Sequence, residues 1–139
     1  MHVLDTDHMT VLERGGTQAL ALSLRLNGLA DTEVATTIVS YEEQCKGWLA
    51  MTSRERDEAL IRAYAQLGQN LAIYAGMLVL PYDRRAHTVF LTLQSQRIRI
   101  GTQDLKIAAI ALANDATLLT RNVAHFSRVP NLRAEDWTK

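Results

Sequence analysis

Three carboxylates and one amide carry the chemistry that this sequence suggests, although they lie far apart along the chain: Asp5, Glu43, Asp104 and Asn122. If folding brings the carboxylates together, their charges repel and raise one another's pKa, so the cluster needs a cation to neutralise it. Oxygen ligands without cysteine or a histidine pair favour a hard ion such as Mg²⁺ or Mn²⁺. Such an ion can activate a bound water and neutralise charge on a phosphodiester, which is the chemistry of metal-dependent nucleases.

Each of the three carboxylates also has a structural interpretation when it is considered alone. Asp5 could form a turn after a strand, Glu43 could pair with Ser40 in a capping box, and Asp104 could lie in the first turn of a helix. Glu42 competes with Glu43, because the capping pattern does not settle which of the two neighbours faces a site. The interpretation as a site therefore depends on convergence of all the residues.

Alternating strand and helix patterns predict an α/β fold. Apolar or β-branched runs predict strands over residues 2–4, 34–39, 77–80 and 117–120. Helical patterns cover residues 17–29, 40–50, 52–75, 83–96 and 102–114, and capping-box spacings start two of them, at Ser40 and at Thr52. We expect a central parallel β-sheet of four to five strands with helices packed on both faces.

The predicted topology brings the four oxygen-bearing side chains to one edge of the sheet. In open α/β sheets, ligands bind outside the carboxyl ends of the strands. Asp5 ends the first strand, Glu43 lies in the first turn of the helix after the second, and Asn122 follows the fourth. Asp104 opens the helix that runs back toward the start of the fourth strand, so it reaches the same edge.

The composition limits the classes of protein that fit. The 139 residues carry 15 basic and 15 acidic side chains, which argues against binding nucleic acid by bulk electrostatics. Residues 1–50 hold seven acidic and three basic side chains, so the excess of positive charge lies in the remainder. The single cysteine excludes an internal disulfide and a cysteine-based zinc site. With no apolar run long enough for a membrane and no leader pattern, we expect one domain over residues 1–139, soluble and cytoplasmic.

At the candidate residues the sequence resembles the PIN-domain family, and its VapC toxins in particular. The opening Leu4-Asp5-Thr6-Asp7 is similar to the family's hydrophobic, Asp, Thr/Ser, Asn/Asp start. The stretch from Ser40 to Gly47 resembles its Ser/Thr, Glu and Gly pattern, and this register selects Glu43 over Glu42. The segments 80–83, 104–111, 118–122, 125–126, 129–132 and 135–137 continue the series, and the ordered set is specific where no single piece would be.

The resemblance implies a single PIN domain acting as a Mg²⁺-dependent endoribonuclease, with Mn²⁺ as a plausible substitute, that cleaves tRNA, rRNA or mRNA. It implies catalytic roles for Asp5, Glu43, Asp104 and Asn122, with Asp5, Glu43 and Asp104 as metal ligands. It also implies a homodimer that is silenced by a cognate VapB-type antitoxin. The homodimer would contact operator DNA only through that antitoxin, and no membrane partner is implied. Many PIN domains have a fourth Asp where this chain has Asn122. An amide ligates without supplying charge, so the alternative is a weakly active or inactive protein that acts mainly as an antitoxin-binding, operator-regulating partner.

Other polar residues near the predicted edge have weaker assignments. Thr6 and Thr120 lie beside the ligands in sequence and could hydrogen-bond the carboxylates or a bound water. The basic residues that could contact RNA phosphates are Arg97, Arg99 and Arg121. The four histidines show no ligand spacing, so they are expected to pack or to lie at the surface without a chemical role; these are His2, His8, His87 and His125.

Overall fold

Five short strands form the centre of the fold in the computed structural model, which describes residues 1–139. They are β1 (His2–Leu4), β2 (Val34–Thr37), β3 (Leu78–Leu80), β4 (Thr117–Leu119) and β5 (Arg133–Glu135). The sheet has the order β3-β2-β1-β4-β5 and every neighbouring pair is parallel, so all carboxyl ends lie at one edge. The predicted α/β fold with a parallel sheet of four to five strands is confirmed.

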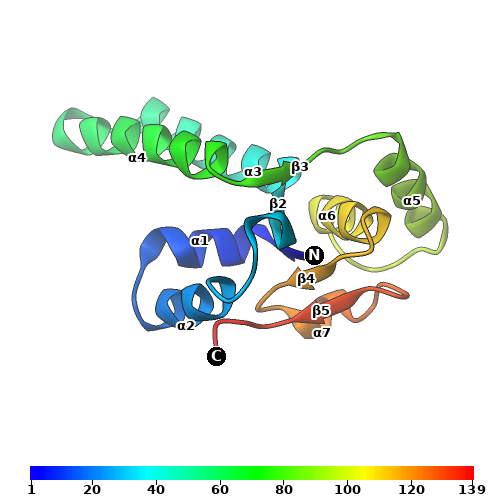
Figure 1. Ribbon diagram of the computed structural model, residues 1–139. Helices are drawn as coiled ribbons and strands as arrows, with labels where there is room; N and C mark the ends of the chain where they lie inside the picture. Colours follow the sequence, from blue (N-terminus) through cyan, green and yellow to red (C-terminus); the bar gives the residue numbers. More distant parts are fainter.

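Helices connect the strands and cover both faces of the sheet (Figure 1). They are α1 (Thr6–Arg14), α2 (Thr17–Leu26), α3 (Ile38–Arg54), α4 (Asp57–Ala75), α5 (Arg84–Ser95), α6 (Thr102–Ala113) and α7 (Val123–Phe126), with a 3-10 turn at Asp31–Glu33. Helices α3 and α4 lie side by side and form an arm that projects beyond the sheet (Figure 1). None of the helices is both long and apolar enough to span a lipid bilayer.

Two apolar clusters hold the helices against the sheet. Successive side chains of a strand point to opposite faces. Val3 and Leu118 therefore pack in the cluster formed with α5 and α6, whereas their neighbours Leu4 and Leu119 pack in the cluster formed with α1 and α2. All four side chains are fully buried. The two central strands are thus anchored on both faces, which fixes the positions of the residues that follow them.

The first helix was not predicted from the sequence. Helix α1 begins directly after β1, with Asp5 as its N-cap: a side-chain oxygen of Asp5 accepts a hydrogen bond from the backbone N–H of His8. Its first turn is Thr6-Asp7-His8, which interrupts the apolar periodicity that identifies a helix. The interpretation of Asp5 as a turn former is therefore wrong, because its side chain starts a helix.

The helix starts predicted at Ser40 and at Thr52 are also wrong. Helix α3 begins two residues before Ser40, and the hydroxyl of Thr37 accepts from the Ser40 backbone N–H as its cap. Residues 52–75 do not form one helix, because Thr52 lies in the last turn of α3 with its hydroxyl donating to the Leu49 carbonyl. The chain is extended at Glu55 and Arg56 before α4 begins. Neither predicted capping box forms.

The fifth strand was not located in the sequence. In β5 the exposed Arg133 and Glu135 flank a half-buried Ala134, so the segment lacks the β-branched or apolar run of the central strands. Charged side chains suit an edge strand, since they oppose pairing with another sheet.

Candidate active site

The structure brings the four predicted site residues together around one cavity of about 340 Å³ at the carboxyl edge of the sheet. The side chains that line the cavity are almost all polar: Asp5, Thr6, Asp7, Thr10, Glu43, Asp104, Asn122 and Phe126. Four different segments of the chain supply them: α1 with its cap, α3, α6, and α7 with its cap. The expected convergence at this edge is therefore observed.

Asp5 is buried at the end of the central strand, with 6% of its surface exposed. Its backbone N–H donates to the Leu119 carbonyl at 3.0 Å, which continues the β1–β4 ladder by one residue. Its Oδ1 accepts from the His8 backbone N–H at 2.8 Å. Asp5 is thus fixed by the sheet on one side and by the first turn of α1 on the other.

Glu43 faces the cavity, whereas Glu42 points to solvent. Oε1 of Glu43 accepts a hydrogen bond of 2.6 Å from the Thr6 hydroxyl, which also lies 3.1 Å from Ser40 Oγ. Glu42 is exposed, and its carboxylate accepts from Gln103 at 2.8 Å and lies 3.4 Å from Lys46 Nζ. The ambiguity between the two neighbours is thereby settled in favour of Glu43 as the residue that lines the cavity.

The cavity environment disfavours charge on Glu43. Burial is the main cause of its raised pKa, the Thr6 hydrogen bond opposes the shift, and the nearby Asp104 and Asp5 raise the pKa further. The neighbouring Glu42 has a lowered pKa, mainly because of its hydrogen bond from Gln103. Two adjacent glutamates on one helix therefore have opposite pKa shifts, because Glu43 is partly buried near other carboxylates whereas Glu42 accepts a hydrogen bond at the surface.

Asp104 lies in the first turn of α6 and is paired with His125, for which the sequence predicted no chemical role. Its Oδ2 is 3.2 Å from Nε2 of His125 in α7. Burial raises the pKa of Asp104, positive charge on His125 lowers it, and Asp5 raises it. From the sequence, His125 was expected to pack or to lie at the surface without a chemical role. In the structure α7, which begins just after Asn122, places His125 against this cavity carboxylate.

Asn122 lines the cavity from the turn after β4, and Thr120 shapes that turn. Thr120 is fully buried, and its Oγ1 accepts from the Asn122 backbone N–H at 3.0 Å. Thr120 is not among the cavity residues, so it positions Asn122 and does not touch the carboxylates. Thr6, in contrast, contacts Glu43 directly.

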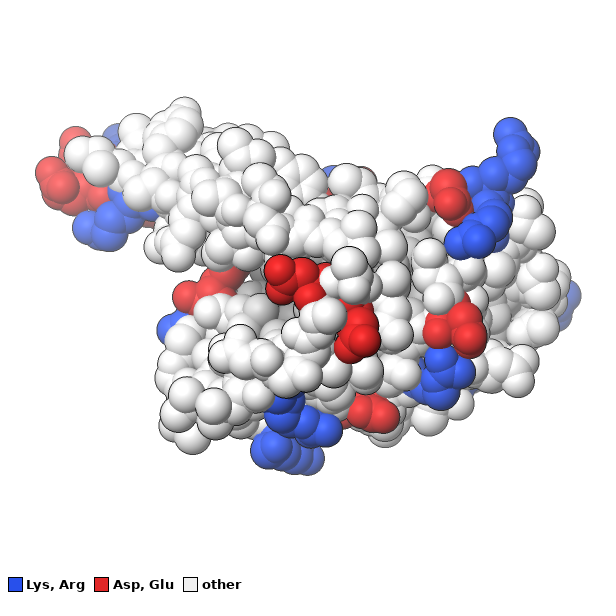
Figure 2. All heavy atoms as spheres, viewed as in Figure 1, with Lys and Arg blue, Asp and Glu red and all other residues white.

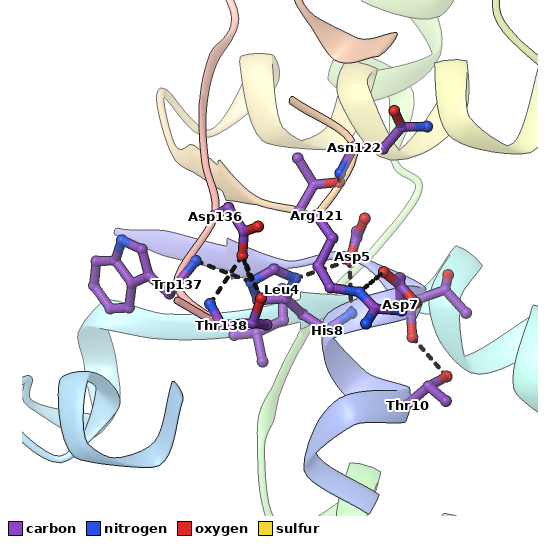
Figure 3. Close-up of polar contacts among 12 residues, drawn as sticks. Leu4, Asp5, Asp7, His8, Thr10, Arg121, Asn122, Asp136, Trp137 and Thr138 are labelled. Atoms are coloured by element: carbon purple, nitrogen blue, oxygen red, sulfur yellow. Dashed lines mark hydrogen bonds and ion pairs between the residues drawn. The ribbon is translucent and has the colours of Figure 1, made fainter. Parts of the chain in front are cut away.

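The three arginines suggested as RNA contacts lie in two different places. Arg121 forms a two-pronged ion pair with Asp7, at 2.6 and 2.9 Å (Figure 3). It also donates to Gln18 at 3.0 Å. It therefore lies beside the cavity with its guanidinium already engaged. Arg97 and Arg99 are exposed in the connection between α5 and α6, and neither lines the cavity.

The donor set fits a hard divalent ion. It consists of the carboxylates of Asp5, Glu43 and Asp104, the Asn122 amide and two threonine hydroxyls, all oxygen donors of the kind that Mg²⁺ and Mn²⁺ prefer. The fourth carboxylate of the lining, Asp7, is paired with Arg121. Burial is the main cause of the raised pKa of both Glu43 and Asp104, and the nearby Asp5 raises both further. No three Asp, Glu, His or Cys side chains stand close enough to share an ion as they are. Direct ligation of one cation by all three carboxylates would require them to move closer together.

A larger groove of about 1010 Å³ continues from the cavity between α1 and the α3–α4 arm, and the two share Thr6, Thr10 and Glu43. Figure 2 shows acidic atoms beside the hollow beneath the arm, while most basic atoms on this face lie toward the rim. The groove also contains the apolar side chains of Trp48 and Met51. It offers space for an extended or helical segment next to the cavity.

Comparison with known proteins gives similar chains over the full length. No family model matches the chain. It is 30% identical over 141 residues to Ribonuclease VapC1 of Haemophilus influenzae strain R2866. This alignment covers 100% of this chain and 99% of the relative. The solved structure of VapBC-1 from nontypeable Haemophilus influenzae matches with a TM-score of 0.71 and 28% identity, over 99% of this chain and 98% of that one.

A second solved structure, of DNA-bound VapBC from Salmonella typhimurium, matches in fold. Its TM-score is 0.77 at 23% identity, over 98% of this chain and 97% of that one. The strand order and the flanking helices are therefore those of a known architecture, and the sequence similarity extends from the first strand to the last.

Proposed function

This chain belongs to the VapC family of ribonucleases, and from that membership we propose that it is the Mg²⁺-dependent endoribonuclease of a toxin–antitoxin pair. The proposal rests mainly on one observation: Asp5, Glu43 and Asp104, from three separate segments, line one cavity at the carboxyl edge of the sheet. We infer that these carboxylates hold the ion, with Mn²⁺ as a substitute. A bound Mg²⁺ would supply Lewis acidity, activating a water and neutralising charge on the scissile phosphodiester.

The residues of the chain itself have distinct tasks in this proposal. The Thr6 hydroxyl fixes the rotation of Glu43 by binding Oε1, which leaves Oε2 for the ion. Asn122 presents an amide oxygen, which can bind the ion without adding another negative charge. Without a cation, the three carboxylates would repel a phosphodiester, so substrate binding and metal binding should be linked.

We propose that a cognate VapB-type antitoxin covers the groove between α1 and the arm. The groove joins the cavity, so a segment lying in it would reach the carboxylates. Its floor carries apolar Trp48 and Met51, and Arg54 and Arg62 lie along its lining. This combination suits an amphipathic segment that buries its apolar face and pairs acidic residues with the arginines. Through that partner the complex would contact operator DNA.

We further propose a homodimer. The arm exposes large apolar side chains on α4, with Ile61 62%, Tyr64 59% and Leu71 59% exposed. These large apolar side chains are uncovered in the single chain, and such patches mark contacts with other chains. Light scattering at micromolar concentration should give a particle of about twice the 15.5 kDa of one chain. A particle of one chain's mass would contradict the dimer.

Cleavage of RNA in vitro tests the proposed activity. The purified chain, incubated with total RNA and Mg²⁺, should produce discrete new 5′ ends, and chelation of the metal should abolish them. Asp5→Asn is the matched inactive control, because asparagine still caps α1 while the charge is lost. Expression without the antitoxin should slow growth and co-expression should restore it. Binding of antitoxin without any metal-dependent cleavage would instead favour the regulatory partner that Asn122 suggests.

A further inference from the structure

His8 is a fully buried polar residue that the proposed chemistry does not use. It lies in the first turn of α1 and points beneath Asp5 toward the C-terminal segment (Figure 3). Its ring nitrogens face two parts of the chain that are more than a hundred residues apart. Nδ1 faces Asp5 and Nε2 faces the backbone of Trp137.

The contact with Trp137 determines where the ring carries its proton. The Trp137 backbone N–H donates to Nε2 of His8 at 3.3 Å, so Nε2 acts as an acceptor. A neutral imidazole with an acceptor at Nε2 has its hydrogen at Nδ1. The ring thus presents an N–H toward Asp5.

That N–H has no hydrogen-bond partner in the structure, although Nδ1 is buried. Nδ1 lies 3.6 Å from Oδ1 of Asp5, which is beyond hydrogen-bond distance. The same Oδ1 accepts from the His8 backbone N–H at 2.8 Å, so it already faces this residue. A buried donor without a partner, aimed at a cavity carboxylate, requires only a small movement to complete its hydrogen bond.

We propose that His8 is a positioning residue: its Nδ1–H hydrogen-bonds Oδ1 of Asp5 when that carboxylate takes a cation, and its Nε2 ties this arrangement to the C-terminal segment. The inference rests on the proposed function of Asp5 as a metal ligand. With Oδ1 held by two donors from one residue, Oδ2 is left for the ion. Partners that fix a ligand's orientation strengthen metal binding in this way.

Local contacts hold the C-terminal segment, residues 136–138, in place beside His8. Oδ1 of Asp136 accepts from both the backbone N–H and the hydroxyl of Thr138, at 2.9 and 2.6 Å. The Trp137 ring is buried and packs against His2 and under the Arg25 guanidinium. These contacts present the Trp137 backbone N–H to His8. Asp136 also lies 3.9 Å from Nε2, so a doubly protonated ring between two carboxylates is the competing arrangement.

Two conservative variants separate the two ends of the histidine. In H8N the amide nitrogen occupies the place of Nδ1, so the donor to Asp5 remains and the acceptor for Trp137 is lost. In H8Q the amide oxygen reaches the place of Nε2, so the acceptor remains and the donor is lost. A residue that only fills space would be affected similarly by both changes.

Calorimetry of Mn²⁺ binding and amide hydrogen exchange should show opposite patterns for the two variants. We expect H8Q to bind Mn²⁺ about 10-fold more weakly or worse and H8N to stay within about twofold of the unchanged protein. We expect slow exchange of the Trp137 amide in H8Q and fast exchange in H8N. Equal loss of affinity in both variants, or equal affinity in both, would overturn the proposal.

The unchanged protein provides a test that does not depend on the stability of variants. Nitrogen-15 NMR of the histidine rings at neutral pH should show His8 as the neutral tautomer with hydrogen on Nδ1. The opposite tautomer or an imidazolium would overturn the link. If the unchanged protein bound no Mn²⁺, the proposed metal function would fail, while the tautomer and the exchange of the Trp137 amide would still decide whether His8 joins Asp5 to the C-terminal segment.

Discussion

Oδ2 of Asp104 lies 3.2 Å from Nε2 of His125, where the first turn of α6 faces α7. Asp104 is otherwise surrounded by groups that disfavour its charge, since burial and Asp5 both raise its pKa. His125 is thus the one neighbour that lowers the pKa of this carboxyl. Because His125 lowers the pKa of Asp104, it should help this carboxyl stay charged, and so bind a metal ion, at lower pH.

Replacing His125 by Phe should raise the pH at which the protein loses Mn²⁺ on acidification. Removing the histidine removes the influence that lowers the Asp104 pKa, so the carboxyl takes up its proton at a higher pH and no longer binds the ion. Calorimetry between about pH 5 and pH 8 measures the shift. His87→Phe on α5 is the matched control, because His87 is exposed and does not line the cavity. Identical profiles for the His125 variant and the unchanged protein would refute the assignment.

Changing Asp104 to Asn should lower Mg²⁺ affinity and RNA cleavage together, each by about 10-fold or more, because one ligand charge is lost at nearly constant shape. The metal-free protein should be as stable or slightly more stable in urea unfolding with chelator, since repulsion of Asp104 by Asp5 is relieved. Asp115→Asn is the control, as Asp115 is exposed and far from the cavity. Cleavage at the unchanged rate in the Asp104 variant would remove this residue from the mechanism.

The two adjacent glutamates of α3 form a matched pair for a second test. Glu43→Gln should weaken Mn²⁺ binding by about 10-fold or more, because it removes a cavity carboxylate, whereas Glu42→Gln should change it by less than about twofold. Both variants lose the same charge one residue apart, so overall electrostatics are equal. Similar binding losses in the two would show that Glu43 acts only through net charge.

Asn122→Asp should tighten Mn²⁺ binding and destabilise the metal-free form. One more carboxylate adds attraction for the ion and repulsion in its absence, on the order of 1 kcal/mol at low salt. Urea unfolding with and without Mn²⁺ gives both effects, because metal that binds only the folded state stabilises it. Asn131→Asp, at an exposed turn with a φ of 67°, serves as control. A variant whose metal-free stability and Mn²⁺ affinity both stay constant would place Asn122 outside the site.

The ion pair between Arg121 and Asp7 should contribute little to stability despite its short distances. The two side chains are 38% and 43% exposed, so water and salt screen the attraction. A double-mutant cycle with Arg121→Gln and Asp7→Asn should give a coupling of about 0.2–1 kcal/mol that falls as salt is added. A coupling that does not change with salt would indicate that the pair is more shielded than its exposure suggests.

The sequence was sufficient to predict the fold class and the convergence of the carboxylates because both follow from periodicity. Val3 and Leu4 divide between two buried clusters, as a central strand requires, and parallel strands must end at one edge. Helix α1 was missed because its first turn is polar. The break between α3 and α4 was placed too early in the chain because Thr52 and Glu55 have capping-box spacing, whereas the structure breaks at Glu55 and Arg56.

Other features depend on contacts between distant segments, which periodicity does not encode. His125 meets Asp104 only because the fold brings α7 against the first turn of α6. His8 meets Trp137 only because the C-terminal segment packs against the start of the chain. A lone histidine has no spacing partner in the sequence, so no local pattern could have assigned either one. The opposite orientations of Glu42 and Glu43 likewise depend on Thr6 and Gln103 from other helices.

The central place of β1 in the sheet bears on the order in which the protein can become active as it is made. This strand is synthesised first, yet one of its two neighbours is β4, at Thr117–Leu119. Pairings so distant in sequence form late, after long loops have closed. Asp5 therefore lacks its hydrogen bond to Leu119 until most of the chain has emerged from the ribosome. Until then the cavity also lacks Asp104 and Asn122, so the site is incomplete. A growing chain of this protein would be unable to cut the RNA that surrounds it during translation.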